Sequence, residues 1–272
     1  MSTVTRHEMP NGDVVFYDDP KHSYWREHDE LRGKCSGRLT GASTISKVFD
    51  LDAFGPGAGW GAKMTREGVS ILAAEGLSEP DSLAWLASPD GIYDRLRDAR
   101  LRHTDKRDDA ADRGTNVHDV VLASLATTGA APDLPSLTED EAGYARGLLG
   151  WWLDRGPVGE RSELVVTDLE NGTAGRLDLI CTIDGRRFLV DLKTGKQLRT
   201  SAHVQARGYE WMYTVSGGEP VDDVLLVLAR ADGSWLECEC AASERDWLDA
   251  VQVYRSAAGI RRRQGAVERA AA

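Results

Sequence analysis

The sequence has no apolar run that approaches the ~20 residues of a membrane-spanning helix, and Met1–Pro10 is polar, without the apolar core of a signal peptide. The spacing of its 4 cysteines matches neither a paired zinc site nor a disulfide framework. The G-x-x-x-x-G-K-[ST] pattern of nucleotide-driven motors is also missing. We therefore expect a cytoplasmic protein with reduced thiols, no membrane partner and no motor of its own.

What is present is the composition of a folded protein. The 272 residues are 41% hydrophobic and 28% charged, which allows a sizeable core without disulfides. With 33 Lys and Arg against 44 Asp and Glu, the net charge is −11, which argues against a protein that coats nucleic acid through its overall field. Positive charge is nevertheless concentrated in Asp94–Arg107 and Arg186–Arg199. Each of these segments is either a solvated face or part of a local basic groove.

The first half of the chain reads as a loop-rich arm followed by helices. Short strands are expected at Val14–Tyr17 and Tyr24–Arg26. Apolar residues at helical spacing then predict helices, which begin and end as follows: Ala62–Ala74, Asp81–Arg102, Asp108–Ala126, and a helix that starts at the capping box Thr138–Glu141 and stops at Gly156.

The second half changes to strand periodicity at Glu163. The expected elements, in order, are strands at Leu164–Thr167, Ala174–Ile183 and Arg187–Lys193, a helix at Ser201–Val215, strands at Val221–Ala229 and Ser234–Cys240, and a helix from Ser243 to Arg261–Arg263. This order predicts an α/β fold, with a mixed sheet flanked by helices. We expect residues 1–105 to form an N-terminal arm and helical region that packs on a core formed by residues 106–272.

The dipeptide Asp184-Gly185 favours a two-residue hairpin turn. That turn places Asp178 opposite Asp191 and Arg176 opposite Lys193 on one face of the hairpin. Carboxylates in such positions lie about 4.5–5.5 Å apart at Cβ and destabilise the pair unless something compensates. A hard divalent cation such as Mg²⁺ or Mn²⁺ would compensate, and so would solvent together with the neighbouring cationic side chains.

The surrounding motifs resemble those of one enzyme family. The sequence reads Gly-Arg-Leu-Asp at Gly175–Asp178, Asp-Leu-Lys-Thr-Gly at Asp191–Gly195, Gln-x-x-x-Tyr at Gln205–Tyr209, and Arg-Gly-Thr-Asn-Val-His at Arg113–His118. Together they resemble the signature of the RecB-like branch of the PD-(D/E)xK nuclease superfamily, over about residues 108 to 215. Two N-terminal stretches, His22–Tyr24 and Thr40–Ser46, resemble phage-type exonucleases of this branch.

The resemblance implies a restriction-endonuclease-like core with an N-terminal arm and a helical insertion. It also implies a site in which Mg²⁺ or Mn²⁺ is bound by His118, Asp178, Asp191 and the backbone carbonyl of Leu192. In that site Lys193 orients the attacking water or helps to deprotonate it. The remaining residues that the resemblance brings in are Gln205 and Tyr209, which contact Lys193 or the DNA backbone, and Glu163, an acid on the preceding strand.

The expected function is a metal-dependent DNA exonuclease that hydrolyses phosphodiester bonds at the ends of linear DNA, in phage or bacterial recombination, repair or genome processing. Any recombinase or helicase would be a separate partner. An endonuclease on the same fold and a noncatalytic nucleic-acid-binding module are the alternatives. Paired carboxylates about 5 Å apart also suit a retaining glycosidase, but Lys193 and His118 have no evident place in that chemistry.

Overall fold

The computed structural model describes residues 4–29, 31–49, 67–72, 89–102, 113–118, 121–122 and 137–271. The chain divides into two compact units, one formed by Met1–Asp50 with Val117–Ala272 and the other by Leu51–Asn116. This division differs from the expected single boundary after residue 105. The first fifty residues group with the C-terminal half because their last strand pairs with a strand of that half.

A nine-stranded mixed sheet forms the centre of the larger unit. Its strands are β1 (Val4–Glu8), β2 (Val14–Asp18), β3 (Ser23–Asp29), β4 (Lys34–Gly41), β5 (Val158–Asp168), β6 (Thr173–Ile183), β7 (Arg186–Thr194), β8 (Asp223–Ala229) and β9 (Trp235–Glu239). The strand order is β1-β2-β3-β4-β6-β7-β8-β9, with β5 beside β6. The pairs β4–β6 and β7–β8 are parallel and the others are antiparallel.

One edge of β6 is shared by two strands. Along its whole length β6 pairs with β5. On the opposite edge, its first residues, Thr173 and Ala174, pair with β4, whereas its last five, Leu179–Ile183, pair with β7. Residues 175–178 therefore face the place where β4 ends and β7 separates from β6. We call this place the split edge.

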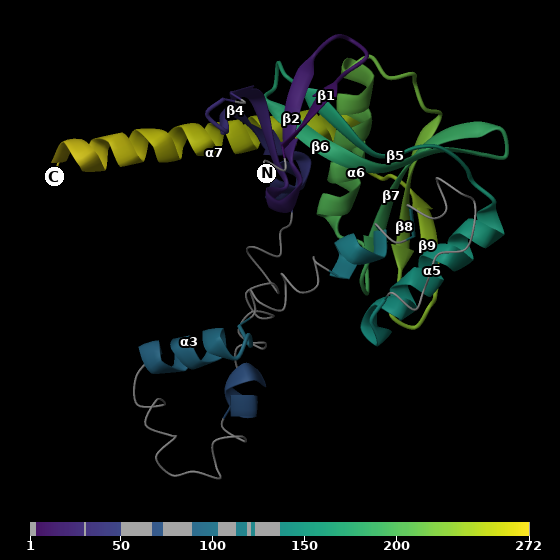
Figure 1. Cartoon of the computed structure of the whole chain (residues 1–272), viewed down its shortest axis with the longest axis horizontal. Coiled ribbons are helices and arrows are strands. Elements are labelled where there is room, and N and C mark those ends of the chain that lie inside the picture. The colour runs from purple at the N-terminus through teal and green to yellow at the C-terminus, as the bar shows by residue number, and fades with distance from the viewer. Residues whose placement is uncertain are drawn as a thin grey trace. The chain divides into compact units, whose positions relative to one another are not determined.

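Helices cover both faces of the sheet (Figure 1). The helices of this unit are α1 (Ala42–Ser46), α5 (Glu139–Arg155), α6 (Thr200–Val215) and α7 (Glu244–Ala271), with short 3-10 turns η1 (Asp19–Lys21) and η2 (Lys47–Phe49). The helix α3 (Pro89–Asp98) belongs to the other unit. Leu179, Cys181 and Val190 pack with α5, and Ile180 and Leu189 pack with α6 and α7. Because side chains alternate along a strand, β6 and β7 are buried on both faces rather than on one.

Local signals in the sequence are confirmed. Asp184 and Gly185 both have positive φ angles, 51° and 78°, as a two-residue hairpin turn requires. Thr138 and Glu141 form the capping box of α5, with the Thr138 N–H donating to Glu141 Oε2 at 2.8 Å. The C-terminal helix was predicted too short, since α7 continues past Arg263 to Ala271.

Most of the remaining helical predictions fall outside the described residues. Within the three helices expected between Ala62 and Ala126, the described parts at 67–72, 89–98 and 113–118 are helical. The fold class is α/β, as expected. In the part of the chain that the structure describes, no helix combines the length and hydropathy needed to cross a bilayer.

Candidate metal centre

The two aspartates of the hairpin lie at the split edge, where regular pairing stops. The expected register holds from Ile183–Arg186 to Leu179–Val190. Beyond Leu179 and Val190 the backbone pairing of β6 with β7 stops. There the Asp178 side chain bonds to β7, and its Oδ2 accepts the Leu192 N–H at 2.7 Å. The side chain therefore replaces a backbone carbonyl as the partner of Leu192, which satisfies a buried N–H where the strands separate. Asp178 and Asp191 are therefore not paired with each other in the β6–β7 ladder, although Asp191 pairs with Leu226 of β8.

Asp191 is fully buried, with an exposed fraction of 0%. Its Oδ2 lies 2.6 Å from Lys193 Nζ, while its Oδ1 has no hydrogen-bond partner among the described residues. Burial raises the pKa of Asp191 to about 6, against the opposing attraction of Lys193 and with a further upward push from Asp178. A buried carboxylate oxygen that lacks a partner is the kind of atom that a cation or a donor from a substrate can satisfy.

Lys193 is held as a cation. Burial favours its neutral form, but the charges of Asp191 and Asp178 outweigh burial, so that the pKa of Lys193 is raised. Its Nζ also lies 3.4 Å from the carbonyl oxygen of Leu192. Lys193 lines a pocket of about 170 Å³ together with Arg199 and Gln205, so the ammonium group borders space that a ligand can enter.

Three side chains from separate parts of the chain converge beside Asp178. His118, Glu163 and Asp178 each offer a ligand atom, and these atoms lie within 4.8 Å of one another. His118 Nδ1 is 3.8 Å from Asp178 Oδ1. Imidazole and carboxylate oxygens are common ligands of divalent metals. Of the residues predicted as metal ligands, His118 and Asp178 belong to this group, while Asp191 and Leu192 lie on the adjacent strand.

Glu163 has an unusual backbone for a strand residue. Its φ angle is 52°, a left-handed value that few residues other than glycine adopt. The register of β5 against β6, in which Ser162 pairs with Leu179 and Leu164 with Leu177, puts Glu163 opposite Asp178. Its Oε2 lies 2.7 Å from Arg176 Nε. Non-glycine residues held in this conformation are often found at functional sites. The sequence predicted an acid at this position but not its left-handed backbone.

Gln205 and Tyr209 lie on one face of α6, as their spacing predicted. Gln205 Nε2 donates to Tyr209 Oη at 2.6 Å. The ring of Tyr209 packs so closely on Gly175 that a Cβ there would lie 2.4 Å from Tyr209 Cε1. Burial, with the charges of Asp191 and Asp178, raises the pKa of Tyr209 well above its ordinary value. Tyr209 is therefore both a core residue and a protonated phenol beside the aspartates.

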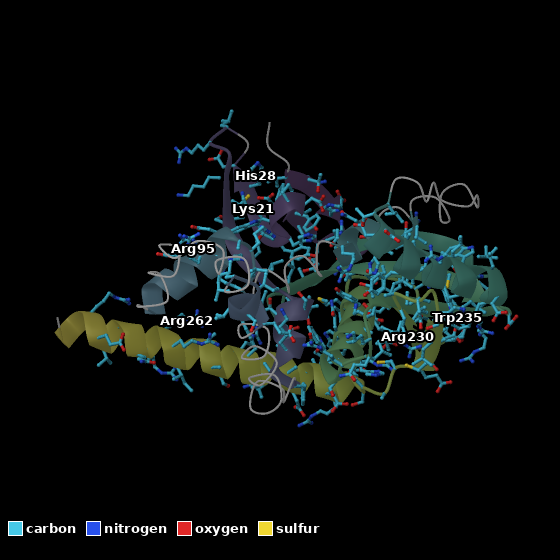
Figure 2. The ribbon with its side chains drawn as sticks, turned by 90° about the horizontal axis from the view of Figure 1, so that it is seen from below. Lys21, His28, Arg95, Arg230, Trp235 and Arg262 are labelled. Carbon is cyan, nitrogen blue, oxygen red and sulfur yellow. The ribbon has the colours of Figure 1, made fainter. Side chains whose placement is uncertain are left out.

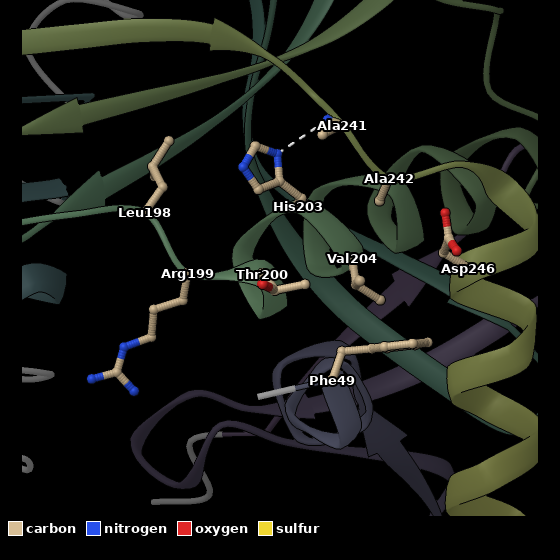
Figure 3. Close-up of a pocket in the computed structure, with 9 residues that line it drawn as sticks. All are labelled: Phe49, Leu198, Arg199, Thr200, His203, Val204, Ala241, Ala242 and Asp246. Atoms are coloured by element: carbon tan, nitrogen blue, oxygen red, sulfur yellow. Dashed lines mark hydrogen bonds between the residues drawn. The ribbon is translucent and has the colours of Figure 1, made fainter. Parts of the chain in front are cut away.

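A second pocket, of about 350 Å³, lies at the start of α6 and was not predicted (Figure 3). His203 points into this region, and its Nδ1 accepts the Ala241 N–H at 3.1 Å. Burial lowers the pKa of His203, although Asp191 acts in the opposite direction. No spacing in the sequence distinguished His203 from an ordinary helix residue.

Several cations of the two basic segments are paired with acidic side chains. Arg187 lies 2.8 Å from Glu160, and Lys193 contacts Asp191, so Arg186–Arg199 is not a uniform basic surface. Its exposed cationic residues beyond the hairpin are Lys196 and Arg199. In Asp94–Arg107, the described Arg97 pairs with Asp94 at 2.7 Å. The arginines at 261–263 are exposed on α7, where Arg262 is seen in Figure 2.

Comparison with known proteins adds little. No protein-family model and no curated protein matches the chain. Among solved structures, it is similar to one titled "Crystal structure of SSO0001", with a TM-score of 0.26 and 16% sequence identity. The match covers 39% of this chain and 55% of that one, so the chain spans about half the length of that protein. Such a likeness carries no argument about function.

Proposed function

We propose that the protein is a metal-dependent nuclease that hydrolyses phosphodiester bonds in DNA, built on a restriction-endonuclease-like core of the RecB-like type. One observation carries the proposal. At the split edge, three carboxylates, a histidine and a charged lysine gather from β5, β6, β7 and the helical segment around His118. Like charges gathered there would destabilise the fold, so the arrangement favours a role in binding cations and phosphate.

The donor set fits a hard divalent cation. His118, Glu163 and Asp178 offer ligand atoms within 4.8 Å of one another, and Asp191 adds a buried oxygen that has no hydrogen-bond partner among the described residues. Carboxylate oxygens with one imidazole suit Mg²⁺ or Mn²⁺ better than the soft metals that thiolates prefer. A bound cation of this kind neutralises phosphoryl oxygens and lowers the pKa of water.

Lys193 brings a positive charge to this arrangement. Its ammonium group lies 2.6 Å from Asp191 Oδ2, and the charges of Asp191 and Asp178 raise its pKa. A protonated lysine that borders a pocket can donate to a phosphate oxygen or orient a water molecule. We infer that Lys193 holds the phosphodiester or the attacking water, and that Asp191 fixes its position.

The neighbouring surface supplies contacts for the DNA backbone. Gln205 and Arg199 line the same pocket as Lys193, and Lys196 is exposed beside it. Amide and guanidinium groups donate to phosphate oxygens without reading sequence. The proposed substrate is therefore a DNA strand held by its backbone, with an exonuclease acting on ends preferred over an endonuclease.

Labelled linear and closed circular DNA, each incubated with Mg²⁺, Mn²⁺ or EDTA, test the proposal. We expect linear DNA to be degraded to small products with metal and to stay intact in EDTA. The variant Asp191→Ala should be inactive, while Asp249→Asn on the exposed start of α7 should match the wild type.

The other outcomes separate the alternatives. Cleavage of circular DNA would replace the exonuclease by an endonuclease. Metal-independent binding without cleavage of either substrate would show a noncatalytic nucleic-acid-binding module and overturn the enzymatic proposal.

A further inference from the structure

We propose that the N-terminal β2–η1–β3 segment is part of the metal centre: through Asp19 and Tyr17 it holds Arg176, and Arg176 holds Glu163 in place beside His118 and Asp178. This inference rests on the proposed function, because it assigns Arg176 and Asp19 as positioning residues for the proposed metal ligands. It gives a role to an N-terminal stretch that the site itself leaves unexplained.

Glu163 is the ligand that most needs support. Its left-handed backbone conformation, with φ at 52°, is costly for a residue with a side chain, roughly 1–3 kcal/mol. Its carboxylate also faces that of Asp178 across the β5–β6 register. A residue in such a position persists only where its surroundings hold it, and the 2.7 Å ion pair with Arg176 is one contact that holds the carboxylate.

Arg176 is itself held on its far side by the N-terminal sheet. Its Nη1 lies 3.1 Å from Asp19 Oδ1, and its guanidinium lies 5.6 Å from the centre of the Tyr17 ring. The guanidinium thus bridges Asp19 and Glu163 with different nitrogens, and its central carbon lies over the Tyr17 ring. Because a guanidinium is planar and rigid, fixing it at Asp19 and Tyr17 also fixes the direction in which it meets Glu163.

The N-terminal segment is firmly attached at this point. Tyr17 stacks on Tyr24, with ring centres 4.8 Å apart, and both rings share a core with Val165 and Ala174. Val165 and Ala174 each lie two positions from the ion pair, on β5 and β6. Burial, with the charge of Tyr24 and against that of Arg176, raises the pKa of Tyr17, so the ring that Arg176 meets is neutral.

Mn²⁺ binding to the full-length protein, measured by calorimetry in the absence of DNA, tests the inference. We expect Arg176→Gln to bind Mn²⁺ about 10- to 100-fold more weakly, the usual loss when a group that orients a ligand is removed. Arg176→Lys should recover part of the affinity, because it restores the charge but not the rigid fork. Arg186→Gln, on the same hairpin and exposed, is the matched control and should bind like the wild type.

Asp19→Asn provides a test that does not risk the fold, because the Asp19 side chain is 61% exposed. We expect a loss of affinity of roughly two- to fivefold, in the same direction as for Arg176→Gln but smaller. Circular dichroism in EDTA shows whether each variant is folded. Saturating Mn²⁺ should restore cleavage by folded Arg176→Gln, since only the affinity for metal is reduced.

Three outcomes overturn the inference. Wild-type affinity in both Arg176→Gln and Asp19→Asn would mean that the contacts are only structural. Tighter binding by Arg176→Gln would mean that Arg176 competes with the metal for Glu163. A wild-type protein that binds no Mn²⁺ would overturn the proposed function together with this inference, whereas the first two results leave that function intact.

Discussion

The two ends of the β6–β7 hairpin are built from the same strands but differ in backbone pairing and in the kind of side chain that they bury. At the closed end, next to the turn, five residue pairs are regularly hydrogen-bonded and their side chains enter two apolar cores. At the open end, which lies at the split edge, β7 separates from β6. The residues there are charged: Asp178 accepts a hydrogen bond from β7, and Asp191 forms an ion pair with Lys193. Apolar packing and the buried charged groups are thus separated along one hairpin.

The comparison shows how a sheet can hold charges that it would otherwise reject. A fully paired ladder leaves each carboxylate directly opposite another on one face. Where the strands separate, Asp178 is instead held by the N–H of Leu192, and Asp191 is held by Lys193. The closed end provides the rigidity that keeps these groups in place.

Substitutions at the two ends should have opposite effects on activity and stability. We expect Asp191→Ala and Lys193→Ala to lower the rate of metal-dependent DNA cleavage by more than about 100-fold while the protein stays folded, with a smaller loss for His118→Ala. Ile180→Val, at the closed end, should cost about 0.5–1.5 kcal/mol of unfolding free energy and leave the rate unchanged. Single-turnover cleavage and urea unfolding measure the two quantities. Wild-type turnover by folded Asp191→Ala or Lys193→Ala would contradict the assignment of the site.

One glycine at each end of the hairpin allows the same substitution, Gly to Ala, to be compared at the open end and at the turn. Gly175→Ala would bring a Cβ to 2.4 Å from the Tyr209 ring, so we expect the ring to shift and cleavage to fall by roughly 10- to 100-fold. Gly185→Ala, in the turn, meets no atom within 4 Å and only strains a positive φ angle. It should destabilise the protein by about 1–2 kcal/mol and leave cleavage per folded molecule unchanged. Equal rates for the two variants would show that Tyr209 has no part in the site.

The open end should also make stability depend on pH in the absence of metal. The pKa of Asp191, raised to about 6, means that the folded state holds this proton more tightly than the unfolded chain does. The metal-free protein therefore loses stability as pH rises through about 6. Between pH 5 and 7.5 we expect the wild type to lose roughly 1 kcal/mol more than Asp191→Asn does in EDTA. Urea unfolding measures this difference. Identical losses of unfolding free energy in the two proteins would mean that the pKa of Asp191 is not raised in the folded state.

The smallest expected effect concerns DNA binding beside the open end. Replacing Lys196 or Arg199 by Gln should weaken binding similarly for all DNA sequences and reduce the slope of log K against log salt by about 1. Arg186→Gln, at the closed end, should leave the slope unchanged. Fluorescence anisotropy in Ca²⁺, across a series of salt concentrations, measures the slopes. A steep slope that no substitution changes would place the DNA elsewhere on the protein.

The sequence predicted what depends on neighbouring residues. The turn at Asp184-Gly185, the register of the closed end and the capping box of α5 were all predicted, because each follows from local backbone preferences. The open end could not be predicted in the same way. Extending the closed-end register to Asp178 and Asp191 assumed that β7 stays beside β6, and nothing local indicates where two strands separate.

Two further features could not be predicted, because they too depend on contacts that are not local in the sequence. The pairing of β4 with Thr173 and Ala174 depends on a contact between distant parts of the chain, so the N-terminal arm was not expected to share the sheet. The left-handed conformation of Glu163 also depends on its surroundings, since no turn residue marks it in the sequence. Both features shape the candidate site, which is why only part of its geometry could be predicted.

The pairing of β4 with β6 has a consequence for the order in which the protein is assembled. Thr40 and Thr173 are separated by about 130 residues, and contacts across so long a loop form slowly because closing the loop costs entropy. The β6–β7 hairpin, by contrast, joins neighbours and can form within microseconds. We expect the hairpin to fold early and the site at its open end to be completed last. A partly folded or nascent chain would therefore carry the aspartates without their supporting partners, and the proposed cleavage activity would appear only after both halves of the chain have met.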